Sequence, residues 1–354
     1  MAHLISNDKK LPILSAIELP PFPENETNSH LFYSSIFNRI ANFLLCNTRL
    51  CLPMERTFKF LEIEFYLNDV TNDHDDPYSH GHEHQLTCGE WYFHRVGKNG
   101  YRGGSRKGID ITFGSVERKI YGGILIRTIQ NELTNEVIEG PSLIVDKILE
   151  ACDVNQGGIR EMVEIVWKGK SGILCDMSNS NGLVYLTQVN DDELTNLNNI
   201  VESDKKRLKY STGLTSPYFD QKSQKSYDVR LTGGNKPTNK IYTSPRVGIT
   251  LSNELPSTSL RLQYLLKPYR FFTSPHLLKK GKAQLIIGLY DHFKEIHKVA
   301  EVADISRSLV ERYIQERTNG IKNGDLNEFI GKKGKGINGI EYCKMAGAVN
   351  KIIG

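Results

Sequence analysis

The amino-acid sequence predicts an α+β protein that ends in a helical segment. Short runs rich in β-branched and aromatic residues follow one another from Phe58 to Ile129, separated by loops of Gly, His and charged residues. From Lys279 onward, apolar residues recur at helical spacing instead. Hydrophobic residues make up 39% of the 354-residue chain and charged residues 24%, which provides enough apolar side chains for a core.

Two helices are expected before the C-terminal segment. Apolar residues at helical spacing run from His30 to Leu52, and Pro53 ends the pattern. A second helix is expected to begin at Pro141, because proline is favoured in the first turn of a helix.

Composition divides the chain into three parts. We expect an extended lead-in over residues 1–30 and the α+β domain over residues 31–275, with a polar insertion at about 155–242. Residues 276–354 hold 14 Lys and Arg against 9 Asp and Glu, a net of +5, whereas the whole chain has +4. This basic helical module favours an acidic partner, and an ordinary solvated surface is the alternative.

Residues 297–316 are spaced as in a helix–turn–helix. Ser306 would cap the second helix, and Val310 and Tyr313 would face back toward the first. Asp304 stands where that motif usually has glycine, so an ordinary pair of helices is the alternative.

The six cysteines have neither CxxC spacing nor the density of a disulfide framework, which favours reduced thiols. We see no signal-peptide pattern and no run of the roughly 18–20 apolar residues that a membrane span needs. The expectation is a soluble intracellular protein of the nucleus or cytoplasm with no membrane partner. The oligomeric state stays open, with a monomer as the expectation.

Two carboxylates alternate on the expected strand LEIEFYL (Leu61–Leu67). Glu62 and Glu64 therefore point to the same face of that strand. A pair of this kind usually marks a solvated face, but a carboxylate that faces a pocket can act as a general base.

Arg127 lies in GGILIRTI, an otherwise apolar strand. A charge there must pair or meet a pocket, because burying it alone is costly. Glu64 or Asp110 on a neighbouring strand is the expected partner.

The loop DHDDPYSHGHEH (Asp73–His84) concentrates imidazoles and carboxylates. His80, His82 and His84, with the nearby Asp cluster, could bind a divalent metal, since both groups are metal ligands. No HExxH helix or Cys partner supports such a site, so a polar surface loop is the alternative.

The loop YRGGSRKG (Tyr101–Gly108) could bind phosphate. Glycine exposes backbone N–H groups there, and Arg102, Arg106 and Lys107 add positive charge. The loop is not a Walker loop, and a solvated hairpin tip is the alternative.

Taken in order, these segments resemble the alkyladenine (3-methyladenine) DNA glycosylase family. The family has Glu-Xaa-Glu-Ala-Tyr-Leu and then Asp-Pro-Ala-Ser-His, and this chain has LEIEFYL and DPYSH. Its Leu-Asn-Ile strand, Leu-Leu/Ile-Arg-Ala strand and Gly-Pro helix correspond to GIDIT, GGILIRTI and EGPSLIVDKIL. Late in the chain, PRVGI and KPYRFFTSP match two further motifs. Together the matches cover about residues 58–150 and 243–275.

The resemblance implies a curved, mainly antiparallel sheet with flanking helices and a base-excising site. Glu64 would activate a water that attacks C1′ of a flipped nucleotide, and Arg127 would hold that water and the carboxylate. Tyr66 and His80 would sandwich the extruded base, and Asp110 would lie on the pocket floor. No metal and no other cofactor would be needed.

Two departures from the family bear on selectivity and partner. Asp110 replaces the family's Asn and places a second carboxylate near Glu64. The GGSRKG loop replaces the duplex-wedging Tyr-Gly pair and displaces Tyr101, so Arg102 or Arg106 could contact phosphate instead.

The implied function is therefore hydrolysis of the glycosidic bond of a damaged, alkylated or deaminated purine in nucleic acid, with DNA as the expected partner. The first alternative is a non-catalytic nucleic-acid-binding protein on the same fold. The second is a metal-dependent hydrolase or nuclease that uses the His and Asp loop.

Overall fold

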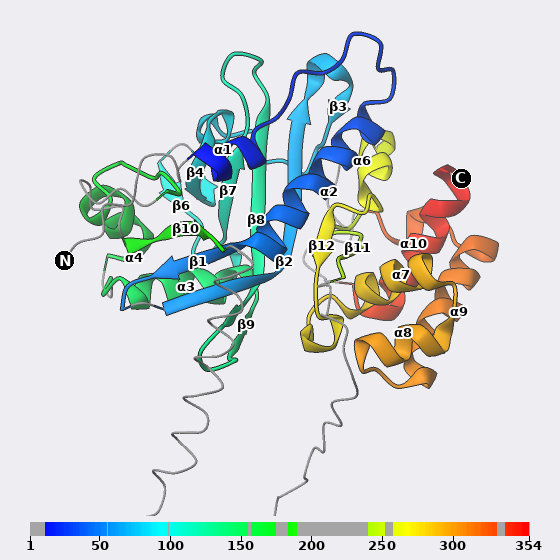
Figure 1. The fold of residues 1–354 in the computed structure, drawn as a ribbon. Helices are drawn as coiled ribbons and strands as arrows, with labels where there is room; N and C mark the ends of the chain where they lie inside the picture. The colour runs from blue at the N-terminus through cyan, green and yellow to red at the C-terminus, as the bar shows by residue number, and fades with distance from the viewer. Residues whose placement is uncertain are drawn as a thin grey trace, which may run out of the picture. The chain divides into compact units, whose positions relative to one another are not determined.

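A computed structural model of the chain describes residues 11–54, 56–97, 99–154, 157–174, 183–189, 240–251, 258–330 and 337–353. The described residues up to Gln188 and from Ile241 onward form one compact unit. The helices of this unit are α1 Leu11–Ile17, α2 Ser29–Asn47, α3 Pro141–Ala151, α4 Gly158–Glu161, α6 Thr258–Leu265, α7 Lys282–Phe293, α8 Ile296–Ala303, α9 Arg307–Asn323 and α10 Gly339–Ile353 (Figure 1).

Its strands are β1 Thr48–Leu52, β2 Arg56–Asp69, β3 His74–Asp75, β4 Cys88–Phe93, β5 Arg95–Val96, β6 Gly100–Tyr101, β7 Ile109–Phe113, β8 Tyr121–Asn131, β9 Val137–Glu139, β10 Tyr185–Gln188, β11 Tyr242–Ser244 and β12 Arg270–Phe272. The main sheet runs in the order β10-β1-β2-β8-β7-β4, and β3, β9, β11 and β12 attach to its sides. All pairs of named strands are antiparallel.

The 14-residue strand β2 is the centre of this sheet. Along one edge it pairs with β8, and along the other it pairs first with β1 and then with β12. Its apolar side chains, including Phe65 and Leu67, belong to the larger core, which α2 and α3 cover with Phe37 and Ile148. The expected strand LEIEFYL is thus confirmed, and it lies in the strand that pairs with more of the described strands than any other does.

A paired β-bulge interrupts the β2–β8 ladder. Phe60 lies opposite Ile129 and Ile63 opposite Ile126, but between them Glu62 lies opposite Thr128. Leu61 and Arg127 are therefore the extra residues of the two strands, and the local alternation of side chains is broken.

The C-terminal helices pack against the sheet. Figure 1 shows α7 to α10 gathered beside β11 and β12. Leu285 and Leu289 of α7 share a buried cluster with Leu61 and Phe272, and Val299 and Val310 extend that cluster into α8 and α9. The basic module expected over residues 276–354 accordingly lies in the same compact unit as the sheet.

Helices α8 and α9 are joined by the short turn Asp304–Ser306. Asp304 adopts the left-handed conformation (φ 51°, ψ 51°) that glycine usually supplies, and its N–H bonds the carbonyls of Ala300 and Glu301. Ser306 is the N-cap residue of α9, although its side chain makes no capping hydrogen bond. The helix–turn–helix spacing is therefore present, and its use in binding nucleic acid stays a prediction.

Three expectations differ from the structure. Residues 11–17 form helix α1 rather than an extended lead-in, because Ile13 and Ile17 lie four residues apart and are both buried in the core. The first long helix ends at Asn47, and the rest of its expected range is β1. Within the expected insertion, β10 pairs with β1, and residues 175–182 and 190–239 lie outside the described residues.

Candidate functional site

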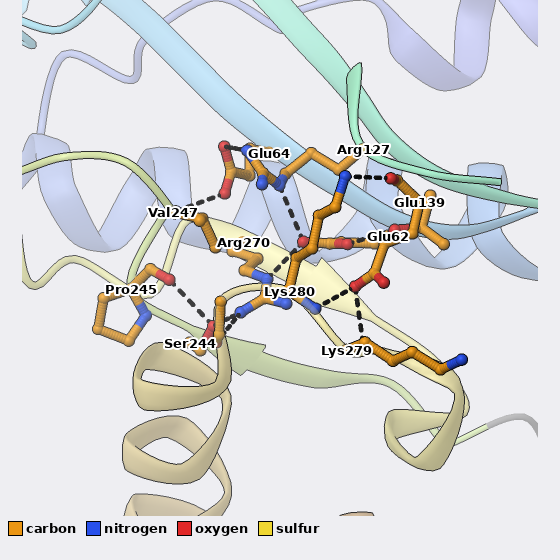
Figure 2. Close-up of polar contacts among 12 residues, drawn as sticks. Glu62, Glu64, Arg127, Glu139, Ser244, Pro245, Val247, Arg270, Lys279 and Lys280 are labelled. Carbon is orange, nitrogen blue, oxygen red and sulfur yellow. Dashed lines mark hydrogen bonds and ion pairs between the residues drawn. The ribbon is translucent and has the colours of Figure 1, made fainter. Parts of the chain in front are cut away.

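Two glutamates of β2 and arginines of two neighbouring strands meet in a buried polar cluster (Figure 2). The Oε1 atom of Glu62 accepts hydrogen bonds from Arg127 Nε at 2.9 Å and from Arg270 Nε at 2.7 Å. Thr128 Oγ1 donates to the other oxygen of Glu62 at 2.5 Å. The bulge makes this possible, because it lets the consecutive residues Arg127 and Thr128 both reach one carboxylate.

Glu64 is held by three different parts of the chain. Its Oε1 accepts the backbone N–H of Val247 at 2.7 Å, and its Oε2 accepts the hydroxyl of Tyr66 at 2.9 Å. Arg127 Nη1 lies 3.4 Å from Oε2, so Arg127 bridges both glutamates. The expected pairing of Glu64 with Arg127 is confirmed, and the carboxylate is completely buried.

Charge balance decides the ionisation of this cluster. Burial raises the pKa of Glu62, but the charges of Arg270 and Arg127 outweigh that effect, so its pKa lies below the ordinary value. Burial lowers the pKa of Arg127, and Glu64 and Glu62 more than reverse this, so its pKa is raised. Glu62 is therefore an anion that neutralises arginine.

Burial first, and the negative charge of Glu64 second, raise the pKa of the Tyr66 phenol well above its ordinary value. Tyr66 is thus a neutral hydroxyl that donates to Glu64. The Arg246 guanidinium covers the Tyr66 ring, with its central carbon 4.5 Å from the ring centroid.

Arg246 is itself buried and neutralised by Asp76. Its Nη1 and Nη2 atoms donate to the two carboxylate oxygens of Asp76 at 2.5 and 3.1 Å. This bidentate pair ties the turn after β11 to the loop that begins with DPYSH. It therefore holds Arg246 in place over the Tyr66 ring, whose hydroxyl bonds Glu64.

Helix α10 takes part in covering this region. Tyr342, Met345 and Ala346 of α10 form a buried cluster with Ile249 and Leu251, and Tyr66 and Tyr78 pack against that cluster. The Tyr342 hydroxyl is buried without a hydrogen-bond partner, as is that of Tyr78. Burial is the main cause that raises the pKa of Tyr342, and the charges of Tyr78 and Glu64 also raise it.

Asp110 does not pair with Arg127. His94 Nε2 lies 2.8 Å from Asp110 Oδ1, and Gln85 Nε2 donates to Asp110 Oδ2 at 3.3 Å. The His80 ring lies edge-on to the His94 ring with their centroids 4.4 Å apart, and His80 is exposed. The structure thus places Asp110 and His80 together, with His94 between them.

The basic glycine loop is folded back on the protein. Arg102 donates from Nε to the carbonyl of Arg95 at 3.1 Å, and Lys107 forms an ion pair with Asp146. The Tyr101 ring lies under the Arg95 guanidinium at 4.7 Å. Arg106 is exposed, so among the four residues expected to contact nucleic acid it is the most accessible.

A pocket of about 400 Å³ lies beside this loop, at the edge of β4. Its lining includes Tyr101, Arg95, Asn99 and Arg160, and Glu64 is not among the lining residues. The pocket is therefore a feature distinct from the carboxylate cluster.

The His and Asp loop does not converge as a metal site. His82 and His84 stack on each other, with ring centroids 5.3 Å apart, and His74 is buried against Tyr269. Within the described ranges, no group of three His, Cys, Asp or Glu side chains lies close enough to hold a metal ion. The metal-dependent reading therefore has no support from the part of the chain that the structure describes.

Several residues of the site escape sequence reasoning. Arg270 and Arg246 lie in KPYRFFTSP and PRVGI, but nothing local indicates that they pair with Glu62 and Asp76. His94 lies in WYFHRV, and nothing in that run indicates that it pairs with Asp110. A polar residue in an otherwise apolar run was the only available signal for each of them.

Two further observations concern the cysteines and the helices that the structure describes. No disulfide joins any of the five cysteines that the structure describes. Among the described helices, none is both long and apolar enough to cross a membrane.

By fold and site, the protein is an α+β protein whose curled antiparallel sheet buries paired glutamates against arginines. No family model matches the chain. It is similar to uncharacterized protein L759 of Acanthamoeba polyphaga mimivirus, with 39% identity over 125 residues, covering 32% of this chain and 56% of that protein. The match spans little more than half of the relative's length, and the relative's name states no activity.

Proposed function

We propose that the protein is a nucleic-acid N-glycosylase of the alkyladenine glycosylase type, which releases a damaged purine by hydrolysis. One observation carries the proposal. The motifs that resemble the family lie far apart in the sequence, yet LEIEFYL, GGILIRTI, PRVGI and KPYRFFTSP meet around Glu62 and Glu64.

The contacts of Glu64 suit a general base. Arg127 and the N–H of Val247 hold the carboxylate in one orientation, and Glu62 absorbs part of the positive charge of Arg127. In the proposed reaction, Glu64 takes a proton from water, the water oxygen bonds to C1′, and the C1′–N bond breaks toward the departing base. The flipped base would stack on His80, which is exposed at the other side of the site.

Because Glu64 is buried, the proposed reaction requires a movement of the protein around it. A carboxylate without exposed surface cannot meet a water or a nucleotide until part of its cover moves. Tyr66, which donates to Glu64, packs against the 249–251 segment and α10, so these are the elements that we expect to move when substrate binds. Nucleic acid would push these elements aside and so open the site, whereas many other enzymes close a loop or domain over their substrate.

The same burial favours a second candidate function. A Glu64 that is fully paired within the protein would also serve as a structural partner of Arg127 in a non-catalytic nucleic-acid-binding protein. Exposed Arg106 and the basic helix α9 would then carry binding alone.

Base release decides between the two candidates. Wild type and Glu64→Gln are incubated with DNA and RNA, single- and double-stranded, that carry alkylated or deaminated purines, and the free base is measured by chromatography. Release by wild type and its loss in Glu64→Gln, with salt-dependent binding retained, is the expected result. The chelator EDTA should leave the rate unchanged. Binding without release from any substrate would favour the binding protein.

A further inference from the structure

A second acid–base group faces the same side of the sheet as Glu64. Asp110 is 2% exposed, and both of its oxygens are engaged, one by His94 at 2.8 Å and one by Gln85 at 3.3 Å. A buried carboxylate that holds an imidazole fixes the orientation of the ring and stabilises its protonated form.

The strand register relates this pair to Glu64. Asp110 of β7 lies opposite Leu125 of β8, and Leu125 lies opposite Glu64 of β2. Residues directly opposite each other in antiparallel strands project to the same face, so Glu64 and Asp110 share a face two strand spacings apart, about 10 Å. A nucleotide between them would meet a carboxylate on one side and an imidazole on the other.

Glycines make room for the pair. A Cβ atom at Gly108 would lie 2.6 Å from both Cε1 and Nδ1 of His94, and a Cβ at Gly123 would lie 2.6 Å from Asp110 Oδ2. Contacts this short are prohibitive, so the two positions must lack side chains for His94 and Asp110 to take their places. The His94–Asp110 pair therefore depends on Gly108 and Gly123 as well as on its own two side chains.

The groups around His94 come from four segments. Tyr92 lies on β4, which ends just before His94, and Asp110 lies on β7. His80 comes from the DPYSH loop, and Arg102 donates its backbone N–H to the His94 carbonyl at 2.9 Å. His80 is exposed and the His94 side chain is 14% exposed, so solvent reaches His94 on this side. Asp110 is the anion in direct contact with the ring.

We propose that His94, held by Asp110, is the catalytic acid that protonates the departing base. The proposal rests on the proposed glycosylase function. Because Nε2 is held by Asp110, the proton leaves from Nδ1. As the C1′–N bond breaks, its electron pair stays on the base nitrogen, which takes that proton from His94.

The remaining atoms balance on the other side. Water gives its oxygen to C1′ and one proton to Glu64, so the products are the free base and a sugar hydroxyl. Glu64 then releases its proton to solvent, and His94 regains one through the exposed side that His80 occupies. No further reactant is consumed.

Two substrates of different charge test the assignment. The N7-methylguanine ring already carries a positive charge and can leave without a proton, whereas neutral hypoxanthine needs one. In single-turnover assays, His94→Gln should slow hypoxanthine release at least about 100-fold, the usual contribution of a general acid. Release of N7-methylguanine should change less than about threefold, and it serves as the internal control for folding. Asp110→Asn, which keeps the shape but removes the charge, should also slow hypoxanthine release selectively.

The dependence of the release rate on pH distinguishes a catalytic His94 from a His94 that only supports the structure. Hypoxanthine release by wild type should fall on the alkaline side, because a catalytic acid must carry its proton, and this limb should be absent for N7-methylguanine. Equal slowing of both substrates by His94→Gln, or no slowing, would overturn the role of His94 while leaving Glu64 in place. If wild type released neither base, the proposed glycosylase function would itself fail, and the acid with it.

Discussion

Glu64 accepts a 2.7 Å hydrogen bond from the backbone N–H of Val247, although 183 residues separate the two in sequence. Because the donor is backbone, no side chain at residue 247 is needed to make the bond. The turn that presents this N–H is fixed by the pair of Arg246 with Asp76. The orientation of the candidate base is thus determined by residues that lie far apart in the sequence.

Glu62 is expected to matter for stability more than for chemistry. Glu62→Gln would leave Arg127 and Arg270 buried without their shared anion, and breaking a buried pair costs about 3–5 kcal/mol. Urea unfolding measures the loss. Glu164→Gln, which removes the exposed partner of Arg160, is the control and should change stability by less than about 1 kcal/mol. Similar values for both variants would contradict the argument.

His74 should make the fold sensitive to acid. Burial first, and the charge of His30 second, lower the pKa of His74 to about 3, while the unfolded chain titrates near 6.5. Between these values the unfolded state binds more protons, so stability is complete above about pH 6.5 and falls as pH drops, by about 1.4 kcal/mol per unit.

The test compares wild type with His74→Asn in chemical unfolding at pH 7 and pH 5. Wild type should lose about 2 kcal/mol more than the variant over that interval. The variant does not titrate at this position, so other histidines cancel in the comparison. An identical loss in both proteins would show that His74 is not the group responsible.

Helices α9 and α10 pack through glycine. A Cβ at Gly347 would lie 2.0 Å from the carbonyl oxygen of Arg317, and a Cβ at Gly320 would lie 2.1 Å from that of Lys344. Gly347→Ala should therefore destabilise the protein by about 1–3 kcal/mol, although alanine is the better helix former. Thermal unfolding checks this, with Gly103→Ala as the control, since nothing lies within 4 Å of its Cβ position. Equal melting of the two variants would refute the close contact.

Cys343 can report on the cover over Glu64. The thiol lies on α10, is fully buried, and has its pKa raised to about 12 mainly by burial, so it should react slowly with alkylating reagents. If nucleic acid displaces α10, the alkylation rate of Cys343 should rise severalfold in its presence. Peptide mass spectrometry measures this, with buried Cys51 on β1 as the internal control. An unchanged rate at saturating nucleic acid would mean that α10 stays closed.

How far the sequence predicts this molecule depends on the range of each interaction. The strand around Glu64 and its pairing with Arg127 follow from alternation and from the cost of an unpaired charge, which are local arguments. The partners Arg270 and Asp76 depend on β12 and on the turn at residues 245–248, which come together only in three dimensions. No spacing rule connects them.

Short strands and tight turns are also hard to predict from the sequence. The motif PRVGI forms a turn with Gly248 at φ 84°, and the neighbouring strand is the three-residue β11 just before Pro245. Asp304 stands where a helix–turn–helix usually has glycine, yet it adopts the left-handed conformation that the turn requires. Three-residue strands and left-handed aspartates leave little periodic signal.

The paired bulge between β2 and β8 has a consequence for how the chain tolerates length changes. Each strand carries one surplus residue, so the two offsets cancel and Glu64 returns to the face opposite the aromatic core. Loss of one residue from either strand alone would leave the offset uncancelled and shift one half of the ladder against the other. Insertions and deletions would thus be accepted here only in matched pairs, one on each strand. Substitutions of Leu61, by contrast, need only preserve the size of its side chain.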